Sequence, residues 1–255
     1  MFTVADARRC AVDLFMQSAI LKTQPRSSLT LDADVLLQRF LNKPRAWLFA
    51  HDDADISPIR EAFYAAAERR CTGLPIAYIT GEKDFWGLSF HVSPDVLIPK
   101  PDTELLVERS LAVIREKAAA LRQEQTLFML DPCTGSGCVT ISILHTLEAE
   151  GIRNICCIAA DISPAALAIA RLNAQRLLSA ETQTRLYIIE GDMRTLPETI
   201  ARFRESLRLD ATPFPKAADR TSSPPLSAEY LRFDLIAANP PYVPSALTQE
   251  LLKDG

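Results

Sequence analysis

The sequence contains no apolar run of the roughly 20 residues that a membrane-spanning helix needs. Its opening segment, Met1 to Asp6, carries a charge where the apolar core of a signal peptide would lie. These two absences argue against an integral membrane protein and against a secreted one. We therefore expect a cytoplasmic protein that does not associate with a membrane.

The sequence also lacks the cysteine and histidine spacing of a metal site. Its six cysteines form no CxxC pair, and they do not cluster with the three histidines, His51, His91 and His145. Zinc sites are usually built from such closely spaced pairs, so we expect no metal. Cys156 and Cys157 lie in an apolar segment, where we expect reduced and buried strand residues.

A long basic tract is absent as well. Lysine and arginine number 28 against 32 aspartates and glutamates, which gives a net charge of −4 and a pI of about 5.5. A protein that holds long nucleic acid needs positive charge to neutralise phosphates. This balance argues mildly against such a protein, although a local basic patch would be compatible with it.

What the sequence does contain is a change of pattern along its 255 residues. Residues 1–72 have the apolar spacing of helices, and we expect a small N-terminal helical domain. Ser57 is expected to cap the last of its helices, with Pro58 at the first helical position. The helices are predicted at 2–21, 31–40, 44–50 and 57–70.

Residues 73–100 change to alternation and are predicted to form a linking β-hairpin. The segments 76–79 and 88–92 would be its strands, on either side of a turn-rich stretch. The proline-containing loop from Leu97 to Glu104 follows, and we expect Asp102 or Thr103 to cap a helix that reaches about residue 121.

From residue 126 strand, loop and helix repeat, which predicts an α/β fold with a parallel sheet and helices on both faces. Residues 101–255 would form the catalytic domain, with a flexible surface insertion at about 201–231, where four prolines gather. The chain stops shortly after the fourth strand, 234–238. We therefore expect the C-terminal strands of a doubly wound sheet to be missing and strand 234–238 to be an exposed edge.

The tetrapeptide Asn239-Pro240-Pro241-Tyr242 follows that fourth strand, at the end of the sheet where ligands bind in open α/β folds. Its prolines lack N–H groups, so the backbone offers acceptors without donors. Such a corner suits an NH2 group on a planar system, whose face the tyrosine ring would cover. A proline-stiffened turn without chemistry is the alternative interpretation.

Polar groups also follow the other three strands. Gly135-Ser136-Gly137 precedes a helix, where glycine lets a ligand approach the backbone and the helix offers N–H groups. Asp161 could accept hydrogen bonds from a ribose diol, or could simply begin a turn. Asp192 could accept one from the amine of adenine, or could be a solvated turn residue. Three such strand ends together favour a nucleotide-like ligand.

Taken together, these motifs resemble those of class I methyltransferases that use S-adenosylmethionine to methylate planar amino groups. Asn-Pro-Pro-Tyr is shared by adenine-N6 nucleic-acid methyltransferases and by the N5-glutamine methyltransferases of peptide chain release factors. The upstream half of the chain is similar to the second group. The segments that carry this similarity are 73–81, 85–88 and 97–108, together with the helical N-terminal region.

The resemblance implies a Rossmann-like class I methyltransferase sheet that binds S-adenosylmethionine. The loop from Cys133 to Gly137 would surround the methionine part, Asp161 would bind the ribose, and Asp192 and Met193 would border the adenine. Cys133 stands where glycine is usual in the family, and Met193 where tryptophan is common. The implied cofactor-binding residues are Cys133, Thr134, Gly135, Ser136, Gly137, Asp161, Asp192, Met193 and Asn239.

The resemblance further implies that Asn239, Pro240, Pro241 and Tyr242 hold the substrate glutamine of a Gly-Gly-Gln loop in a release factor. Asn239, Pro240 and Tyr242 would be the catalytic residues. An amide nitrogen is a poor nucleophile, so orientation by the Asn239 side-chain oxygen and the Pro240 carbonyl would supply most of the rate enhancement. No separate general base is expected.

Three functions remain open at this point. The first is N5-methylation of release factors by a monomeric enzyme, and the acidic pI favours it over the second, adenine-N6 methylation of nucleic acid. The third is a truncated chain that binds ligand or partner without turnover.

Overall fold

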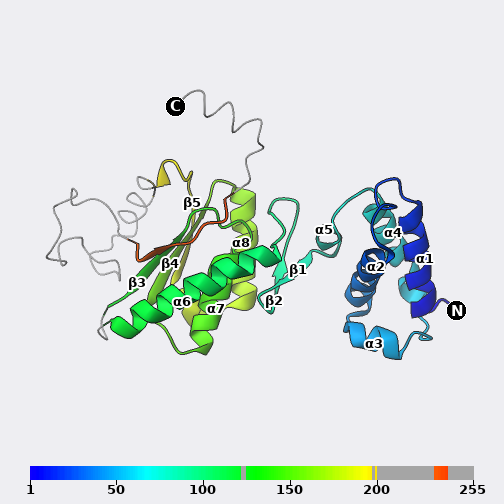
Figure 1. Ribbon diagram of the computed structural model, residues 1–255, viewed down its shortest axis with the longest axis horizontal. Helices are drawn as coiled ribbons and strands as arrows, with labels where there is room; N and C mark the ends of the chain where they lie inside the picture. The colour runs from blue at the N-terminus through cyan, green and yellow to red at the C-terminus, as the bar shows by residue number, and fades with distance from the viewer. Residues whose placement is uncertain (122–124, 197–198, 200–232, 241–255) are drawn as a thin grey trace, which may run out of the picture. The chain divides into compact units, whose positions relative to one another are not determined.

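The computed structural model describes residues 1–121, 125–196, 199 and 233–240. Contacts within the chain divide it into two compact units, residues 1–82 and residues 83–255 (Figure 1). The predicted insertion at 201–231 lies outside the described residues, as do Pro241 and Tyr242. None of the described helices is long and apolar enough to cross a membrane.

The first unit is helical, as predicted. Thr3 opens its first helix with a capping box: its hydroxyl accepts from the Asp6 backbone at 3.1 Å, and Asp6 accepts from the Thr3 backbone at 3.2 Å. Phe15 and Phe63 are fully buried at the centre of the unit. The helices are α1 (Val4–Gln17), α2 (Arg26–Leu41), α3 (Arg45–Ala50), the 3-10 turn η1 (Ser57–Ile59), α4 (Arg60–Cys71) and α5 (Ile76–Thr80).

Two local predictions in this unit are wrong. The segment 76–79 is not a strand but part of helix α5, because Pro75 starts the turn and Gly81, with φ +75°, ends it in the left-handed region. A short apolar run does not distinguish a strand from a helix. Ser57 does not cap a helix either. Its hydroxyl donates to Asp55 Oδ1 at 2.5 Å, and the chain from Ser57 begins as a 3-10 turn.

The predicted hairpin exists, but between β1 (Glu82–Phe85) and β2 (Leu88–His91). Its turn places Trp86 at φ +54° and Gly87 at φ +71°, the left-handed conformations that tight hairpins favour. Trp86 tolerates this conformation because it is held at both ends. Its backbone N–H donates to Glu104 Oε1, and its indole N–H donates to Thr146 Oγ1, each at 2.9 Å.

The second unit contains the predicted parallel sheet. Its strands are β3 (Leu127–Asp131), β4 (Ile155–Asp161), β5 (Leu186–Glu190) and β6 (Leu235–Ile236), in the spatial order β5-β4-β3-β6. β3 pairs in parallel with both β4 and β6. The order of the strands therefore reverses between β3 and β6, which is where open α/β sheets bind their ligands.

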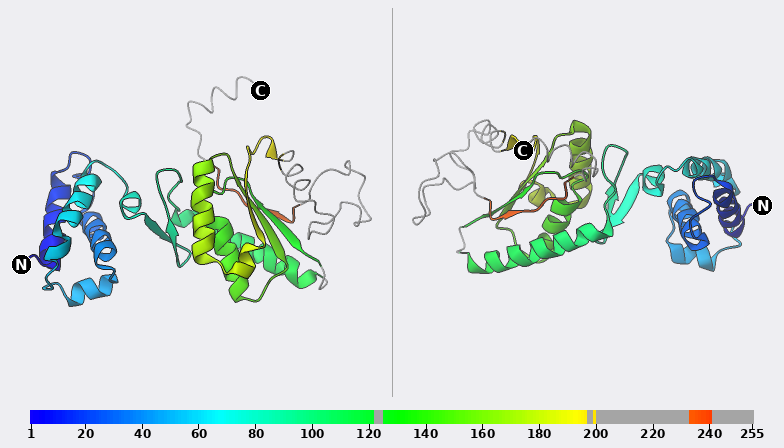
Figure 2. Two further views of the ribbon diagram at one scale, coloured as in Figure 1. Left: turned by 180° about the vertical axis from the view of Figure 1, so that it is seen from behind. Right: turned by 45° about the horizontal axis from the view of Figure 1, so that its top comes forward.

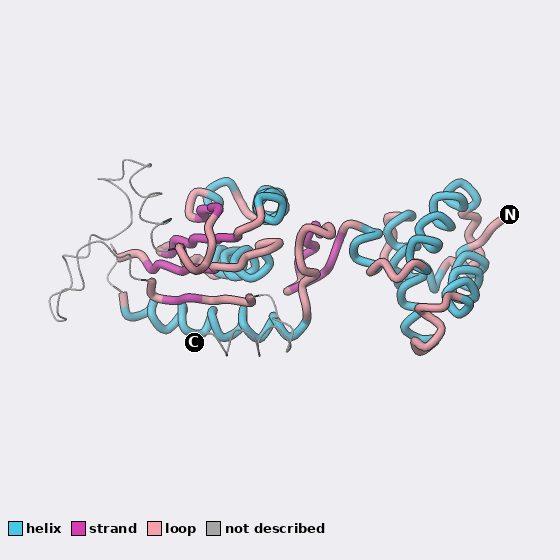
Figure 3. Tube along the Cα trace, turned by 90° about the horizontal axis from the view of Figure 1, so that it is seen from above, coloured by secondary structure: helices cyan, strands magenta, loops and turns pink. Residues whose placement is uncertain are grey.

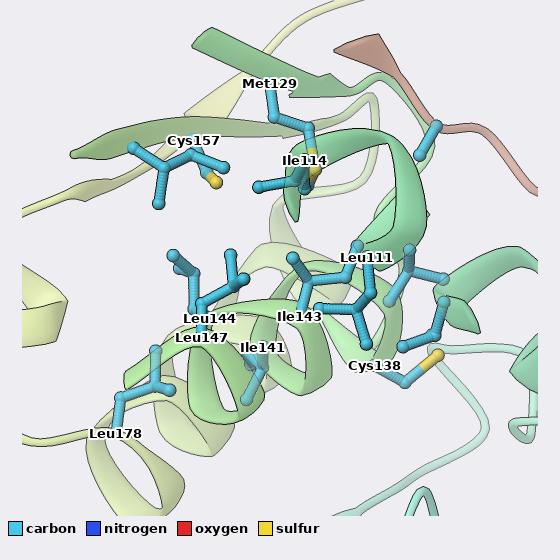
Figure 4. Packing of buried hydrophobic residues seen from close by; sticks show 14 of the residues in the cluster. Leu111, Ile114, Met129, Cys138, Ile141, Ile143, Leu144, Leu147, Cys157 and Leu178 are labelled. Carbon is cyan, nitrogen blue, oxygen red and sulfur yellow. The ribbon is translucent and has the colours of Figure 1, made fainter. Parts of the chain in front are cut away.

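Residue alternation divides the core of this unit between the two faces of the sheet. Helices α6 (Glu104–Ala120), α7 (Cys138–Ala149) and α8 (Pro164–Leu177) pack on one face, where Leu111, Met129 and Leu144 lie close together (Figures 2 and 4). Phe128 and Leu130 point to the other face and form a second cluster with Ile158. Helices α6, α7 and α8 pack on the first face, so a helix layer on the second face stays a prediction.

Three smaller features complete the description of this unit. A short helix, α9 (Ala180–Gln183), precedes β5 and was not predicted. Figure 3 shows the segment that contains β6 running alongside α6, and the contacts between these two elements agree with it. Cys156 and Cys157 are free and buried in β4, as predicted.

Candidate functional site

The glycine loop connects β3 to α7 and is fixed by backbone hydrogen bonds. Thr134 N–H donates to the Ala160 carbonyl at 2.9 Å, and Gly137 N–H donates to the Thr134 carbonyl at 2.8 Å. The space around the backbone differs between Gly135 and Gly137. A Cβ on Gly137 would lie 2.7 Å from Ile141 Cδ1, whereas a Cβ on Gly135 would meet nothing within 4 Å. The backbone at Gly135 is therefore open to a ligand.

Asp161 supports this loop from the end of the neighbouring strand β4. Its Oδ2 accepts from Gly135 N–H at 2.9 Å, and its Oδ1 accepts from Ser163 N–H at 3.0 Å. The second bond is the turn-forming role that was the alternative to ribose binding. A carboxylate has about four lone-pair sites, so these two bonds leave acceptor capacity for a diol.

Asp131, the last residue of β3, is buried below the glycine loop and was not singled out from the sequence. Thr140 Oγ1 donates to its Oδ2 at 2.9 Å. Burial raises the pKa of Asp131 from its ordinary value of 3.8 to about 6, against the opposing effect of hydrogen bonds. The carboxyl group is thus poised to change its charge in the physiological pH range.

Asn173, on α8, is a second site residue that the sequence analysis missed. Its side chain is fully buried and makes three hydrogen bonds. Oδ1 accepts from His91 N–H at 2.7 Å, while Nδ2 donates to the carbonyls of His91 at 3.0 Å and Ser136 at 2.9 Å. One amide therefore connects strand β2 of the hairpin to the glycine loop.

Asp192 and Met193 follow β5, at the far edge of the described sheet. The Asp192 carboxylate is paired with Arg194, whose Nη2 lies 2.5 Å from Asp192 Oδ2. This hydrogen bonding lowers the pKa of Asp192 to about 2. Met193 is 51% exposed. Both residues stand two strands away from β3, so their role at an adenine ring stays a prediction.

The corner after β6 lies next to the end of β3. Ala237 N–H donates to the Leu130 carbonyl at 2.9 Å, which sets Asn239 beyond the end of the pairing. Asn239 Nδ2 donates to Thr103 Oγ1 at 3.1 Å, so the amide oxygen is the end of that side chain left for another donor. Thr103 was expected as a helix cap only. Pro240 is described and the remainder of the tetrapeptide is not.

The structure thus brings Asn239 and the glycine loop to adjacent strand ends at the point where strand order reverses. One of the missed residues had a visible signal: Asn173 interrupts an apolar stripe on α8 that includes Ala166 and Ala170. Thr103 and Asp131 had none beyond their place in a loop and at a strand end.

Cysteine and metal chemistry receive little support from the described part of the chain. Burial raises the pKa of the Cys138 thiol to about 12, which keeps it protonated and unreactive. Cys133 is half-buried, and burial together with nearby carboxylates raises the pKa of its thiol. No group of three or more metal-ligating side chains occurs among the residues that the structure describes.

Comparison with known proteins places this site in context. Residues 16–81 match the family model of the PrmC N-terminal domain. The release factor glutamine methyltransferase of Bordetella pertussis is 37% identical over 215 residues, which cover 84% of this chain and 62% of that protein. The release factor glutamine methyltransferase of Chlorobaculum tepidum is 33% identical over 247 residues, which cover 96% of this chain and 69% of that protein.

The chain spans about three fifths of the length of curated relatives that it matches. Among solved structures, the N-terminal domain of human METTL16 aligns with 66% of this chain and 55% of that one, at 14% identity and a TM-score of 0.38. That similarity is too low to carry an argument, and the fold rests on the strand order itself.

Proposed function

The chain belongs to the release factor glutamine methyltransferase family, and we propose that it methylates the side-chain amide nitrogen of a glutamine in the Gly-Gly-Gln loop of peptide chain release factors. The observation that carries the proposal is the position of Asn239. It follows β6 directly beside β3, and its NH2 group is engaged by Thr103. Its oxygen is then available to a donor, and the nitrogen of a glutamine amide is such a donor.

The methyl donor in this proposal is S-adenosylmethionine, which supplies a methyl group on a positively charged sulfur. The residues at the end of β3 fit such a group. Gly135 leaves its backbone open, and the hydroxyls of Thr134 and Ser136 are buried in the same loop. The loop from Cys133 to Gly137 would hold the methionine part, and Asp161 would accept from the ribose.

At the substrate, the chain's task is to orient a weak nucleophile. The lone pair of an amide nitrogen is delocalised into its carbonyl, so the nitrogen reacts only when it is held in line with the methyl group. Asn239 Oδ1 and the Pro240 carbonyl would each accept one N–H of the glutamine. Orientation of this kind can contribute up to roughly 7–11 kcal/mol. Tyr242, outside the described residues, would cover the amide plane.

Proton transfer does not require a dedicated base. Once the nitrogen carries the methyl group, it is acidic enough to lose a proton to solvent, and the two acceptors are positioned to release it. His91 has no role in this scheme, since its backbone, not its ring, is engaged by Asn173.

The first unit is the candidate for recognising the protein substrate. Its side chains include exposed apolar groups, such as Ile20 at 57% and Phe49 at 58%. Arg8 and Arg45 lie over the Phe49 ring at 4.9 and 5.3 Å, and both also pair with the buried carboxylate of Asp34. In this proposal the enzyme is a cytoplasmic monomer.

Transfer of radiolabelled methyl from S-adenosylmethionine tests the function. We expect the wild-type chain to label a release factor and not a variant of it whose Gly-Gly-Gln glutamine is alanine. Asn239→Ala should lose most of this transfer, by about 100-fold or more. Its affinity for S-adenosylmethionine, measured by calorimetry, should persist, which separates catalysis from binding.

The same assay distinguishes the other functions. Label in DNA or RNA instead of release factor would show an adenine methyltransferase. Binding of S-adenosylmethionine, seen as a raised melting temperature, without transfer to any substrate would show a non-catalytic chain.

A further inference from the structure

We propose that Thr103 is a positioning residue for Asn239: its hydroxyl holds the NH2 end of the Asn239 amide, so that the oxygen end is presented to the substrate. The inference rests on the proposed function and adds a residue to it. The contact on which it depends is the bond from Asn239 Nδ2 to Thr103 Oγ1, at 3.1 Å.

Thr103 occupies the N-cap position of α6 but does not act as a cap. A capping threonine adopts an extended backbone and accepts from a backbone N–H two or three residues on. Thr103 has φ −72° and ψ −18°, because the 3-10 turn η2 (Pro101–Thr103) leads directly into the helix, and its side chain makes no cap bond. The hydroxyl oxygen is therefore available to Asn239.

The position of Thr103 is rigid, as a positioning residue requires. Its N–H donates to the Lys100 carbonyl at 3.0 Å, and the side chain of Thr103 is buried. The next residue, Glu104, accepts from the Trp86 backbone at 2.9 Å, which ties the start of α6 to the hairpin. Figure 3 shows the segment of β6 alongside α6, so the two partners lie on neighbouring elements.

The chemistry explains why such a partner matters. A primary amide has nearly the same shape in both flipped orientations, so packing alone does not select one of them. In one orientation the acceptor oxygen Oδ1 faces the substrate. In the other orientation Nδ2, with its two donor hydrogens, faces it. A glutamine NH2 can bind only to the acceptor. In the structure the Thr103 hydroxyl accepts from Nδ2, and this arrangement leaves the Asn239 oxygen for the substrate.

Two substitutions separate the hydroxyl from the shape of the side chain. Thr103→Val keeps the branched shape and removes the hydroxyl, while Thr103→Ser keeps the hydroxyl. We expect Thr103→Val to lower kcat for methyl transfer about ten-fold without changing the affinity for S-adenosylmethionine. Thr103→Ser should stay within about two-fold of wild type. If the valine variant does not fold, Thr103→Ala replaces it.

A matched control is available in the same unit. Thr182 is also fully buried, and its Oγ1 accepts a side-chain bond, at 2.8 Å from Arg185 Nη2, but it lies in α9 beside β5. Thr182→Val should lower the melting temperature and leave kcat unchanged. An equal loss of kcat in both valine variants would show that Thr103 is structural only and would overturn the inference.

The orientation of the amide can be observed without any activity. The chain has only four asparagines, at 42, 154, 173 and 239, so ¹⁵N-asparagine labelling gives four side-chain amide signals. Asn239→Ala identifies the signal of interest. We expect its NH2 protons to shift and exchange faster in Thr103→Val but not in Thr103→Ser, while the other three signals remain in place.

An Asn239 signal that is the same with and without the hydroxyl would overturn the inference, whatever the activity. The proposed function fails by a different result, absence of transfer to release factor by the wild-type chain. In that case the NMR measurement still decides whether Thr103 holds the amide.

Discussion

The loop after β3 and the loop after β5 carry the same kind of polar residue but differ in how they are supported. In the first, side chains from neighbouring elements hold the backbone: Asp161 binds Gly135, and Asn173 binds Ser136. In the second, Asp192 pairs with Arg194, two residues away, and within the described part of the chain only the backbone of Gly191 is held from another strand, by the Asp161 carbonyl at 3.0 Å. The first loop is preorganised for a ligand, whereas a ligand at the second must displace a local ion pair.

The largest effect on the support of the loop after β3 is expected when the Asn173 side chain is removed. Asn173→Ala would leave buried backbone groups of His91 and Ser136 without partners, and we expect a loss of about 3 kcal/mol in the free energy of unfolding. Urea denaturation measures it. Asn154→Ala is the control and should change stability little, because the Asn154 side chain donates an exposed bond to the Gln125 carbonyl and the substitution keeps the backbone bond to Leu127. Equal stability of the two variants would show that the link to the hairpin is unimportant.

Removal of Asp161 should affect binding more than stability. Asp161→Ala frees the backbone of Gly135 and removes the acceptor proposed for the ribose, so we expect the affinity for S-adenosylmethionine to fall about 10- to 100-fold. Calorimetry measures the change. Asp161→Asn keeps the shape of the side chain, and its affinity for S-adenosylmethionine should lie between those of wild type and the alanine variant. Unchanged affinity in the alanine variant would refute the role given to Asp161.

Asp131 gives the preorganised loop a dependence on pH. Its pKa of about 6 in the folded protein lies above its ordinary value of 3.8, so the folded state binds this proton more tightly than the unfolded chain does. This contribution to stability is present at low pH and is lost as the pH rises through 6. Relative to wild type, Asp131→Asn should be about 2 kcal/mol more stable at about pH 7.5 than at about pH 4.5.

Chemical denaturation of both proteins at both pH values tests this sign, since the other titrating groups cancel in the difference. A difference between the two proteins that does not vary with pH would mean that Asp131 does not titrate in this range.

The smallest effect is expected at the loop after β5. Arg194→Ala would release the Asp192 carboxylate, and the pairing is weak because the Arg194 side chain is 84% exposed. If Asp192 contacts the adenine, affinity for S-adenosylmethionine should rise about two-fold, and Asp192→Ala should then lower it. Should neither substitution alter the binding isotherm, the adenine contact proposed for Asp192 is wrong.

Much of the fold could be predicted from the sequence, because apolar periodicity dominates where elements are long. The parallel strands, α7 and α8 were located to within a few residues, as were α1, α3 and α4 of the first unit, whereas α2 begins five residues before its predicted start. The short elements were not. Residues 76–79 form a helix because Pro75 and Gly81 determine the local backbone, and such capping outweighs the β-propensity of an isoleucine-rich run.

The site was predicted at the level of strand ends but not of hydrogen bonds. The alternating pattern indicates the topology that brings Asn239 and the glycine loop to adjacent strand ends, while the roles of these residues stay predictions. The hydrogen bond between Thr103 and Asn239 could not be predicted in this way, because it joins residues that are 136 positions apart. Partners of this kind depend on tertiary packing, for which one sequence carries no signal.

The pairing of β3 with β6 also has a consequence for the order in which the ribosome delivers the parts of the site. The Phe128 backbone N–H donates to Asp234 Oδ2 at 2.9 Å, closing a gap of 106 residues. During synthesis, the loops after β3 and β4, which we propose to face the nucleotide, emerge well before the corner at Asn239 does, and domains begin to fold from the N-terminal side. A nascent chain released before residue 233 would contain the loops after β3 and β4 but not the corner after β6.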